Sequence, residues 1–460
     1  STTTLSAMLA PLMVQKNDTT ALPWSSIRLD KLTVKNFGFA FDNRLPADRD
    51  TAVAPHVDWK NLRLEDINLS ARNIHYTAEA LDLRVDRVSF REQGGLDLQN
   101  LESDIRLDGE GLTFDGLEYD DTWSQLHADR FRLGFNDFTD FNDLLEKVSV
   151  DLSVLESRLD MRTLYYYTGA EALAKADLGL LLDGTVSGPF SDLRTDLLRI
   201  QSPSKDTRLT FKGRVQGISN INTARIDLQI FDGITRTADI ASMLDQMGMG
   251  INTRSIRKIA PGEPISLKGS INGRLSGLKA DLDVKTASMG SAQVDAHLAK
   301  NGKHMQVEGS ATSQNLDLGR LLSQPSLGTL TADATLAFDN TGGKTRINLT
   351  PARIDHFTFR GYDYHGIVAE AKMVGDNITA DIHSTDPNLQ MNLHGDIDVN
   401  NRTKERRYRI GMDLDTVDLS ALNFDKREGV TASMSLDADI TQTARGDLLG
   451  EATIRSLRGQ

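Results

Sequence analysis

Carboxylates are the residues of this chain whose density could support chemistry, because six of them fall within residues 108–121. They are Asp108, Glu110, Asp115, Glu118, Asp120 and Asp121. Clustered carboxylate oxygens are the ligands that Ca²⁺ prefers. The segment lacks the Asp-x-Asp-x-Asp-Gly loop, however, and aspartate also favours turns for the hydrogen bonds it makes to nearby backbone. We therefore interpret the run as acidic turns and strand ends, with a calcium site as the alternative.

A basic run and a set of histidines are the next candidates. Residues 404–409 read Lys-Glu-Arg-Arg-Tyr-Arg, which indicates a hairpin end and a strand edge blocked by charge, with an anion site as the alternative. The histidines are scattered, and none has zinc-ligand spacing. Four histidines lie on the polar face of predicted strands, namely His297, His304, His383 and His394. We expect these four side chains to be solvated and to bind no metal.

Several function classes are excluded by what the sequence lacks. The chain has no cysteine, so a disulfide, a thiolate metal site and a cysteine nucleophile are ruled out. No serine-hydrolase elbow, phosphate-binding loop or dinucleotide fingerprint is present. The net charge of −13 argues against nucleic-acid binding. We expect no enzymatic activity and no cofactor, although bound phospholipid or detergent would be compatible with the pattern described next.

A recurring strand pattern is the dominant feature. The motif apolar-x-apolar-x-Gly-x-apolar occurs five times, around Gly184, Gly213, Gly269, Gly309 and Gly395. Period-two alternation places the apolar residues on one face of an extended strand. The glycines fall on that apolar face, where a missing side chain opens room or lets the strand bend. Their unequal spacing favours a meander over a solenoid of identical coils.

The alternation divides the chain into four parts. Residues 1–25 are expected to be partly helical, and residues 26–232 form a first β half with short helical breaks near 140–147 and 168–175. The second break is predicted from the capping-box spacing of Thr168 and Glu171. A helical insertion over 233–263 contains a helix at 237–247 that stops at Gly248. Residues 264–460 form a second β half, which we expect to continue into a missing C-terminal part.

Short alternating segments such as 62–64, 67–69 and 74–76 indicate strand after strand, roughly thirty in all. Open twisted sheets rarely exceed about ten strands without curling or splitting. A sheet this long must therefore fold over and enclose either a packed seam or a lined channel. Alternation alone does not distinguish a filled core from an open trough. The strand ends at 317–321 and 418–422 are each predicted to finish in one helical turn.

Several of these segments resemble the TamB/AsmA-like family, named after the translocation and assembly module TamB. The resemblance rests on Leu-x-Leu-Glu-Asp-Ile-x-Leu at 62–69, Asp-Gly-Glu-Gly-Leu-Thr-Phe-Asp-Gly-Leu at 108–117, Leu-Leu-Asp-Gly-Thr-Val-Ser-Gly-Pro-Phe-Ser-Asp-Leu at 181–193 and Asn-Leu-Asp-Leu-Gly-Arg-Leu-Leu at 315–322. It implies a mainly β fold with few short helices, in which an elongated sheet folds over into a U-shaped groove, or β-taco, with an apolar interior. Membership would place the protein in the periplasm, with the full-length protein anchored in the inner membrane.

In such a groove the apolar phase of the strands would contact lipid. The expected lining residues are Leu180, Leu182, Val186, Leu209, Phe211, Val215, Ile226, Leu228, Ile230, Ile265, Leu267, Ile271, Leu282, Val284, Val307, Leu330, Leu336, Phe338, Ile347, Leu349, Leu389, Met391, Leu393, Ile397, Val399, Met434, Leu436 and Ile440. The five motif glycines would face the same groove.

The resemblance implies a segment of a periplasmic bridge that carries phospholipid between the inner and outer membranes and supports outer-membrane biogenesis. Its partners would be phospholipids and an outer-membrane assembly barrel protein of the TamA/BamA type, reached through the missing C-terminal part. One alternative is a chaperone or scaffold that assists outer-membrane protein or autotransporter assembly by β-augmentation. A second alternative is a structural β-sandwich adhesin or surface protein.

Overall fold

The computed structural model describes residues 26–44, 53–171, 173, 179–217, 223–246, 253–258, 262–274, 276–302, 304–322, 324–341, 344–400 and 403–459. The predicted partly helical segment 1–25 and the predicted helix stop at Gly248 lie outside the described residues.

The described chain is mainly β, as the alternation predicts. Its strands form an antiparallel sheet of 24 strands that is not closed into a barrel, since within the described residues β1 (Ser26–Asp42) pairs with β2 (Asn61–Thr77) and the last strand with the one before it. The strands are fewer than predicted because they are longer. Segments 62–64, 67–69 and 74–76 all lie in β2, where Asp66 and Asn73 have positive φ and the register shifts without ending the strand.

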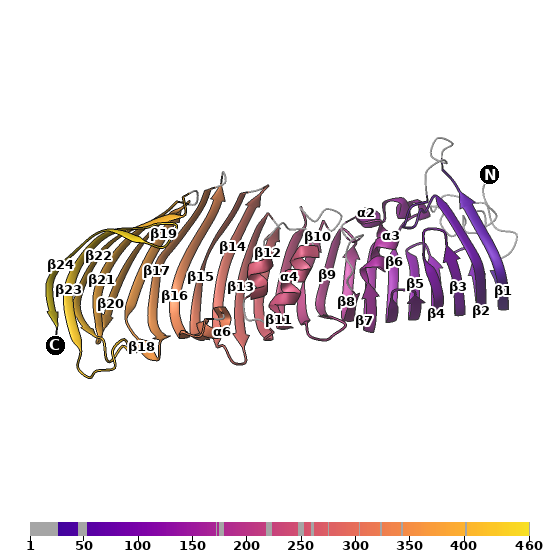
Figure 1. The fold of residues 1–460 in the computed structure, drawn as a ribbon. Helices are drawn as coiled ribbons and strands as arrows, with labels where there is room; N and C mark the ends of the chain where they lie inside the picture. The colour runs from indigo at the N-terminus through magenta and orange to yellow at the C-terminus, as the bar shows by residue number, and fades with distance from the viewer. Residues whose placement is uncertain are drawn as a thin grey trace. The chain divides into compact units, whose positions relative to one another are not determined.

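The chain divides into two compact units, the first ending at Gly233 and the second containing everything from Ile251, with residues 234–250 divided between them. Within each unit the strands lie side by side in chain order (Figure 1). The first unit holds β1, β2, β3 (Ala80–Glu92), β4 (Asp97–Asp108), β5 (Gly111–Asp121), β6 (Gln125–Gly134), β7 (Ser149–Asp160), β8 (Gly179–Pro189), β9 (Asp192–Gln201), β10 (Arg208–Gln216) and most of β11 (Arg225–Thr235).

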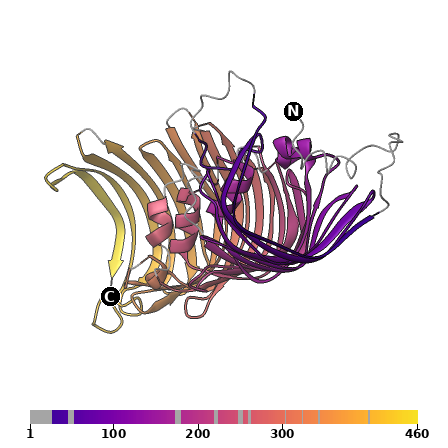
Figure 2. The ribbon, with the colours of Figure 1, turned by 90° about the vertical axis from the view of Figure 1, so that its right-hand side faces the viewer.

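The second unit continues the same antiparallel pattern. It holds β12 (Ile265–Arg274), β13 (Gly277–Thr286), β14 (Ser291–Asn301), β15 (His304–Asp317), β16 (Leu327–Thr341), β17 (Lys344–Phe359), β18 (Tyr362–Tyr364), β19 (Ile367–Val374), β20 (Asn377–Asp386), β21 (Leu389–Asn400), β22 (Glu405–Asp418), β23 (Thr431–Gln442) and β24 (Leu448–Gly459). Figure 2 shows these strands bending along their length. Register shifts within β16–β17 and β22–β23 mark the bulges that accompany such bending.

Two short helical segments interrupt the first unit. The break predicted near 140–147 is present as the 3-10 helix η2 (Phe138–Asp143) followed by α2 (Leu144–Lys147), and Asp137 begins it with a capping box. The break predicted near 168–175 lies partly outside the described residues, which omit 172, 174 and 175. An unpredicted helix, α3, precedes it. Helix α3 spans Met161–Thr168, begins at Asp160, whose carboxylate accepts a hydrogen bond from the Arg162 amide, and ends at Gly169 with φ 63°.

The helical insertion contains α4 (Thr237–Gln246) and α5 (Thr253–Lys258), in agreement with the predicted helix at 237–247. The single helical turns predicted at 317–321 and 418–422 are also present. Helix α6 (Leu318–Leu322) follows β15, and Asp317 accepts a hydrogen bond from the Arg320 amide at 3.0 Å. After β22 a single turn is closed by the Leu422 amide and the Asp418 carbonyl, also at 3.0 Å.

Candidate functional site

The apolar phase of the second unit forms three continuous rows across the sheet. Strand register aligns one residue of each strand from β12 to β24, apart from the short β18, in every row. Row 1 is Gly269, Leu282, Val294, Ala311, Ala334, Ala352, Ala369, Ile382, Leu393, Met412, Leu436 and Ile454. Row 2 is Ile271, Ala280, Ala296, Gly309, Leu336, Leu349, Ala371, Ala380, Gly395, Ile410, Ala438 and Ala452. Row 3 is Gly273, Leu278, Leu298, Val307, Phe338, Ile347, Met373, Ile378, Ile397, Tyr408, Ile440 and Gly450.

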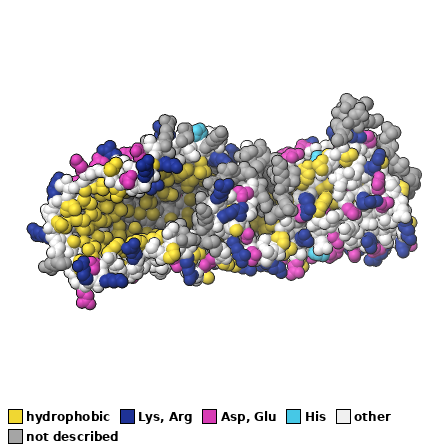
Figure 3. Space-filling model, in the orientation of Figure 1, with side chains coloured by type: hydrophobic (Ala, Val, Ile, Leu, Met, Phe, Trp, Pro, Cys, Tyr) yellow, Lys and Arg dark blue, Asp and Glu magenta, His cyan; other side chains and the backbone are white. Residues whose placement is uncertain are grey.

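We call these three rows the apolar face. Its only side-chain polar group is the Tyr408 hydroxyl. Figure 3 shows hydrophobic side chains gathered in a hollow over the strands toward the C-terminus, bordered by charged side chains. The residues between them in sequence are exposed and largely charged, as in β13, where Lys279, Asp281, Asp283 and Lys285 alternate with half-buried neighbours. Each strand is thus apolar on one side and charged on the other.

The apolar face is neither packed nor fully exposed. Among the predicted lining residues of the second unit, Ile265 is buried and Leu336 is 42% exposed, and all the others are half-buried. The buried apolar cluster of this unit consists of Tyr364, Leu414, Val417 and Leu422, at one end of the strands, and contains no member of the three rows. In the part of the second unit that the structure describes, no buried cluster therefore covers the rows.

The predicted lining residues of the first unit lie on β8 to β11. Leu180, Leu182 and Val186 face Leu159, Ser157 and Leu152 of β7, and Leu209 and Phe211 pair with Ile200 and Leu198 of β9. All are half-buried, as are Val215, Ile226 and Leu228, whereas Ile230 is buried. These residues share a face within their unit.

Farther toward the N-terminus, the apolar side of the first unit is covered. Phe135, Leu144 and Val148, from η2, α2 and their flanks, form a buried cluster with Leu107. Val57 and Tyr166 form another with Leu96, and a third joins β4 to β7. The Val57 amide donates to the Tyr166 carbonyl at 2.9 Å, which ties segment 53–60 to α3. This region is a packed core, and sequence reasoning missed it because the covering residues lie outside the alternating strands.

The motif glycines allow neighbouring backbones to approach closely. A Cβ added to Gly269 would lie 2.0 Å from the Asp281 carbonyl oxygen, and one added to Gly309 would lie 2.2 Å from the Asp295 oxygen. Gly184 and Gly213 face similar carbonyls, of Leu197 and Asp227. Gly395 is the exception, since its nearest neighbour would be Leu393 Cδ2 at 3.7 Å. The sequence predicted that these glycines either open room or let the strand bend. Four of the five allow neighbouring strands to pair closely, which supports the second role.

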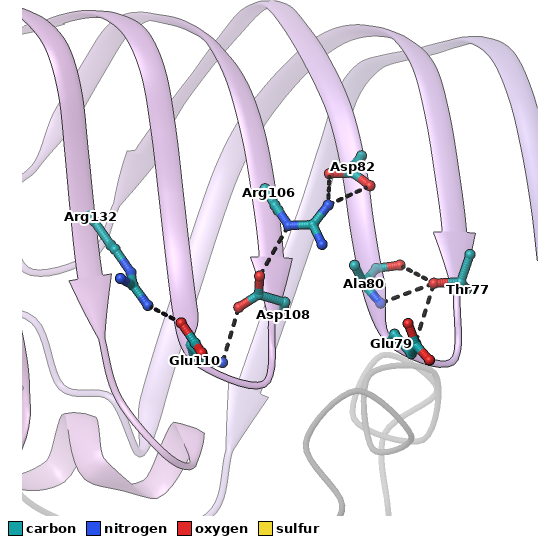
Figure 4. Close-up of polar contacts among 8 residues, drawn as sticks. All are labelled: Thr77, Glu79, Ala80, Asp82, Arg106, Asp108, Glu110 and Arg132. Atoms are coloured by element: carbon teal, nitrogen blue, oxygen red, sulfur yellow. Dashed lines mark hydrogen bonds and ion pairs between the residues drawn. The ribbon is translucent and has the colours of Figure 1, made fainter.

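Two carboxylates of segment 108–121, Asp108 and Glu110, form ion pairs with arginines (Figure 4). Arg106 donates to Asp82 at 2.8 Å and to Asp108 at 3.0 Å, and Arg132 donates to Glu110 at 2.7 Å. Asp121 is buried. No group of three metal-ligating side chains occurs among the described residues. Ion pairs with Arg106 and Arg132 account for Asp108 and Glu110, which makes the calcium alternative unnecessary for these two residues.

Asp121 is the centre of a buried hydrogen-bond network. Its carboxylate accepts from the Trp123 and Ser124 amides, each at 2.6 Å, from the Tyr119 hydroxyl at 2.7 Å and from the Thr163 hydroxyl at 2.9 Å. Burial raises the pKa of Tyr119, so the phenol stays protonated and donates. The network joins β5 to α3 and has a structural role.

The basic run lies at a hairpin end, as predicted, but the predicted strand edge is wrong, because β22 pairs with β21 on one side and with β23 on the other. The four histidines lie on polar faces, as predicted. Lys404 immediately precedes β22, and Arg407 and Arg409 form ion pairs on the polar face. The side chains of His297, His304, His383 and His394 are all exposed. His394 Nδ1 lies 2.6 Å from Asp381, and His383 Nδ1 lies 2.7 Å from Asn392. Neither contact forms part of a metal-binding group.

A pocket of about 540 Å³ lies in the first unit, between segment 53–61 and the helical segments. Its walls include Glu92, whose carboxylate accepts from the Tyr166 hydroxyl at 2.8 Å and from the Gly94 amide at 2.6 Å. These contacts hold the turn after β3 against α3. No nucleophile and general base within hydrogen-bond distance of each other line this pocket among the described residues.

Comparison with models of known protein families, with curated proteins and with solved structures finds no match for this chain. Within the described residues, no helix is both long enough and apolar enough to cross a membrane. The candidate functional site is therefore defined by its own geometry, as an apolar face of three rows.

Proposed function

We propose that this chain is a non-enzymatic carrier that binds the acyl chains of phospholipids on its apolar face. The observation that supports this proposal is the continuity of the three apolar rows over the strands of the second unit, combined with half-buried side chains. An apolar surface this large is rare on a soluble protein unless it binds a partner, a ligand or a membrane.

The energetics favour acyl chains as the ligand. Burial of each methylene is worth about 0.8 kcal/mol, so a chain of about 16 carbons needs a long continuous apolar surface to leave the membrane. Rows 1 to 3 offer such a surface with no polar interruption other than Tyr408. Because no step of the process requires a reacting group, a lipid can move along equivalent side chains without a fixed catalytic site.

We place this activity within the role implied by the family resemblance. In that role the sheet forms a U-shaped groove with an apolar interior, in a periplasmic protein that is anchored in the inner membrane. The protein passes phospholipid to the outer membrane and contacts an assembly barrel of the TamA/BamA type. The exposed polar faces and the absence of cysteine are compatible with that location.

Adjacent residues on opposite faces provide the test. A photoactivatable crosslinker at Leu393 would lie in row 1, whereas one at the exposed Asn392 would lie on the polar face of the same strand. We expect position 393 to crosslink phospholipid after incubation with vesicles of phosphatidylethanolamine and phosphatidylglycerol, and position 392 to give little product. Equal labelling at both positions, together with no phospholipid in the purified protein by mass spectrometry, would overturn the proposal.

A further inference from the structure

We propose that the apolar face has a fixed polarity across its width, with the anionic headgroup of a phospholipid held at the edge that contains Arg406. This inference rests on the proposed function and adds to it a headgroup site and an orientation. It is carried by the residues that follow row 3 on the same face of the strands.

Beyond row 3 the apolar face ends in a polar row, which we call the headgroup row. Cross-strand pairing aligns Lys300 with Met305, Asn340 and Thr345, and aligns Val399 with Arg406, Gln442 and Leu448. Arg406 lies two residues from Tyr408 of row 3, so its side chain is on the apolar side of β22. The residues named here include two cations and two amides, and Asp376, whose carbonyl accepts a hydrogen bond from the Val399 amide at 2.9 Å, places one carboxylate beside the row.

Arg406 differs from its neighbours in its ion pairing. Arg407 and Arg409 lie on the opposite face of β22, where Arg407 pairs with Asp439 and Arg409 contacts Asp396 and Asp398, both at 2.9 Å. Arg406 has no ion-pair partner among the described residues. The polar face therefore satisfies these two arginines with its own carboxylates, whereas the cation at the end of the apolar face lacks an anion.

The opposite edge has a different chemistry. There the strands end in the buried cluster of Tyr364, Leu414, Val417 and Leu422. The buried Asp386 accepts hydrogen bonds from the Tyr362 hydroxyl at 2.7 Å and from the His365 amide at 2.8 Å. A buried carboxylate and packed aromatic rings disfavour an anionic headgroup at this edge. An amphiphile lying across the rows is consequently oriented with its phosphate toward Arg406.

The chemistry of the ligand follows from these two edges. A guanidinium donates two parallel hydrogen bonds to a phosphate, and the Gln442 amide, which pairs across the sheet with Arg406, offers further donors. The ligand is therefore a diacyl lipid with a phosphate in its headgroup. A lipid without phosphate would bind the apolar rows and lose the contact at the edge.

The test compares two lipids that share acyl chains. The purified chain is incubated with vesicles that contain equal amounts of phosphatidylglycerol and diacylglycerol in a phosphatidylcholine background, and bound lipids are counted by native mass spectrometry. We expect phosphatidylglycerol to be favoured by about threefold, the range of an exposed ion pair, and the preference to fall at high salt. Arg406→Gln should remove the preference while leaving diacylglycerol binding unchanged, and Arg406→Lys should keep part of it.

Arg407→Gln is the matched control, because it removes a neighbouring charge from the polar face. An equal effect of Arg406→Gln and Arg407→Gln, or no preference in the unaltered protein, would overturn the headgroup site while leaving acyl binding intact. Failure of both lipids to bind would instead reject the proposed function itself. Loss of all binding in Arg406→Gln with an unchanged circular dichroism spectrum would also contradict a site confined to the headgroup.

Discussion

The first unit and the second unit are built from the same kind of strand, yet only the first has a covered apolar side in the described residues. In the first unit, the segment before η2 supplies Phe135, α2 supplies Leu144, segment 53–60 supplies Val57 and α3 supplies Tyr166 to buried clusters. In the second unit, the buried cluster lies at the strand ends, away from rows 1 to 3. Period-two alternation thus makes a surface, and separate segments decide whether that surface becomes a core.

The covering of the first unit depends on polar contacts as well as on apolar ones. Tyr166 donates to Glu92, and Thr163 and Tyr119 donate to Asp121, so α3 is fixed to the sheet at two points. At Asp121 both carboxylate oxygens have partners, and buried polar groups that are satisfied in this way specify one packing arrangement. The second unit has no such network over its rows in the described residues, which is compatible with a surface that must admit and release a ligand.

The largest difference in stability between the two units is expected when a leucine on the apolar side is replaced by a charged residue. Leu117 is 4% exposed and belongs to the packed core of the first unit, whereas Leu393 is half-buried in row 1. We expect Leu117→Glu to lower the free energy of unfolding by about 4 kcal/mol or more, because it removes core packing and buries a carboxylate. Leu393→Glu should cost less than about 1.5 kcal/mol, since the carboxylate can reach solvent.

Urea unfolding with peptide-level hydrogen exchange would measure each loss in its own unit. An equally large loss for Leu393→Glu would mean that the apolar face is a packed core, and the comparison between the units would then fail. If Leu393→Glu keeps its fold but no longer binds phospholipid, the apolar face of the second unit is a binding surface and not a core.

Two glycines test whether close strand pairing shapes the apolar face. Gly269 has φ 133°, and an added Cβ would lie 2.0 Å from a carbonyl oxygen, so Gly269→Ala should destabilise the second unit by about 2 kcal/mol. Gly395→Ala is the matched control in the same unit, because its added methyl finds only ordinary contacts. We expect its effect to lie within about 1 kcal/mol of zero and to be stabilising in sign. Thermal unfolding of both variants decides the matter, and similar values would reject the role assigned to Gly269.

The smallest effects are expected on the polar faces, where the two units are alike. Arg214 and Arg194 hydrogen-bond Asp192 in the first unit and lower its pKa to about 2. The resulting stability is present above the unfolded-state pKa, near 3.8, and is lost as the pH falls through about 2. Because these side chains are partly exposed, Asp192→Asn should cost less than about 1 kcal/mol at pH 7, and the cost should shrink as the pH falls to 2.

Denaturation of Asp192→Asn at pH 7, 4 and 2 measures this dependence, with Asp196→Asn on the exposed side of the same strand as the control. In the second unit Arg407 lowers the pKa of Asp439 by the same kind of contact, so Asp439→Asn should show a pH dependence of the same sign. A loss that grows toward low pH would contradict the ion-pair explanation.

Sequence patterns predict the strands and their faces well in this chain because both depend on local alternation. The predicted helix at 237–247 and the single turns after β15 and β22 follow from equally local signals. Helix α3, which was not predicted, also has local signals. Thr168 and Glu171 have capping-box spacing, but Asp160 and Gly169 provide the stronger start and stop signals for the helix.

Long-range packing could not be predicted in the same way. Nothing in the pattern around Val57 or Tyr166 indicates that these residues meet over the sheet, since their contact depends on the path of loops between strands. The orientation of Arg406 was present in the alternation of 406, 408 and 410. The sequence did not single out Arg406, because the run 404–409 contains several charged residues. The ion pairs of Arg407 and Arg409 in the structure show that Arg406 is the arginine on the other face.

The pairing of each strand with its neighbours in the chain has a consequence for how such a protein changes in length. In the second unit every hairpin adds two strands whose inward residues take the places already defined by rows 1 to 3. Duplication or loss of a whole hairpin therefore preserves the chemistry of the surface, whereas loss of a single strand reverses the direction of all that follow. Evolution can thus adjust the length of this surface in hairpin-sized steps without changing its chemistry.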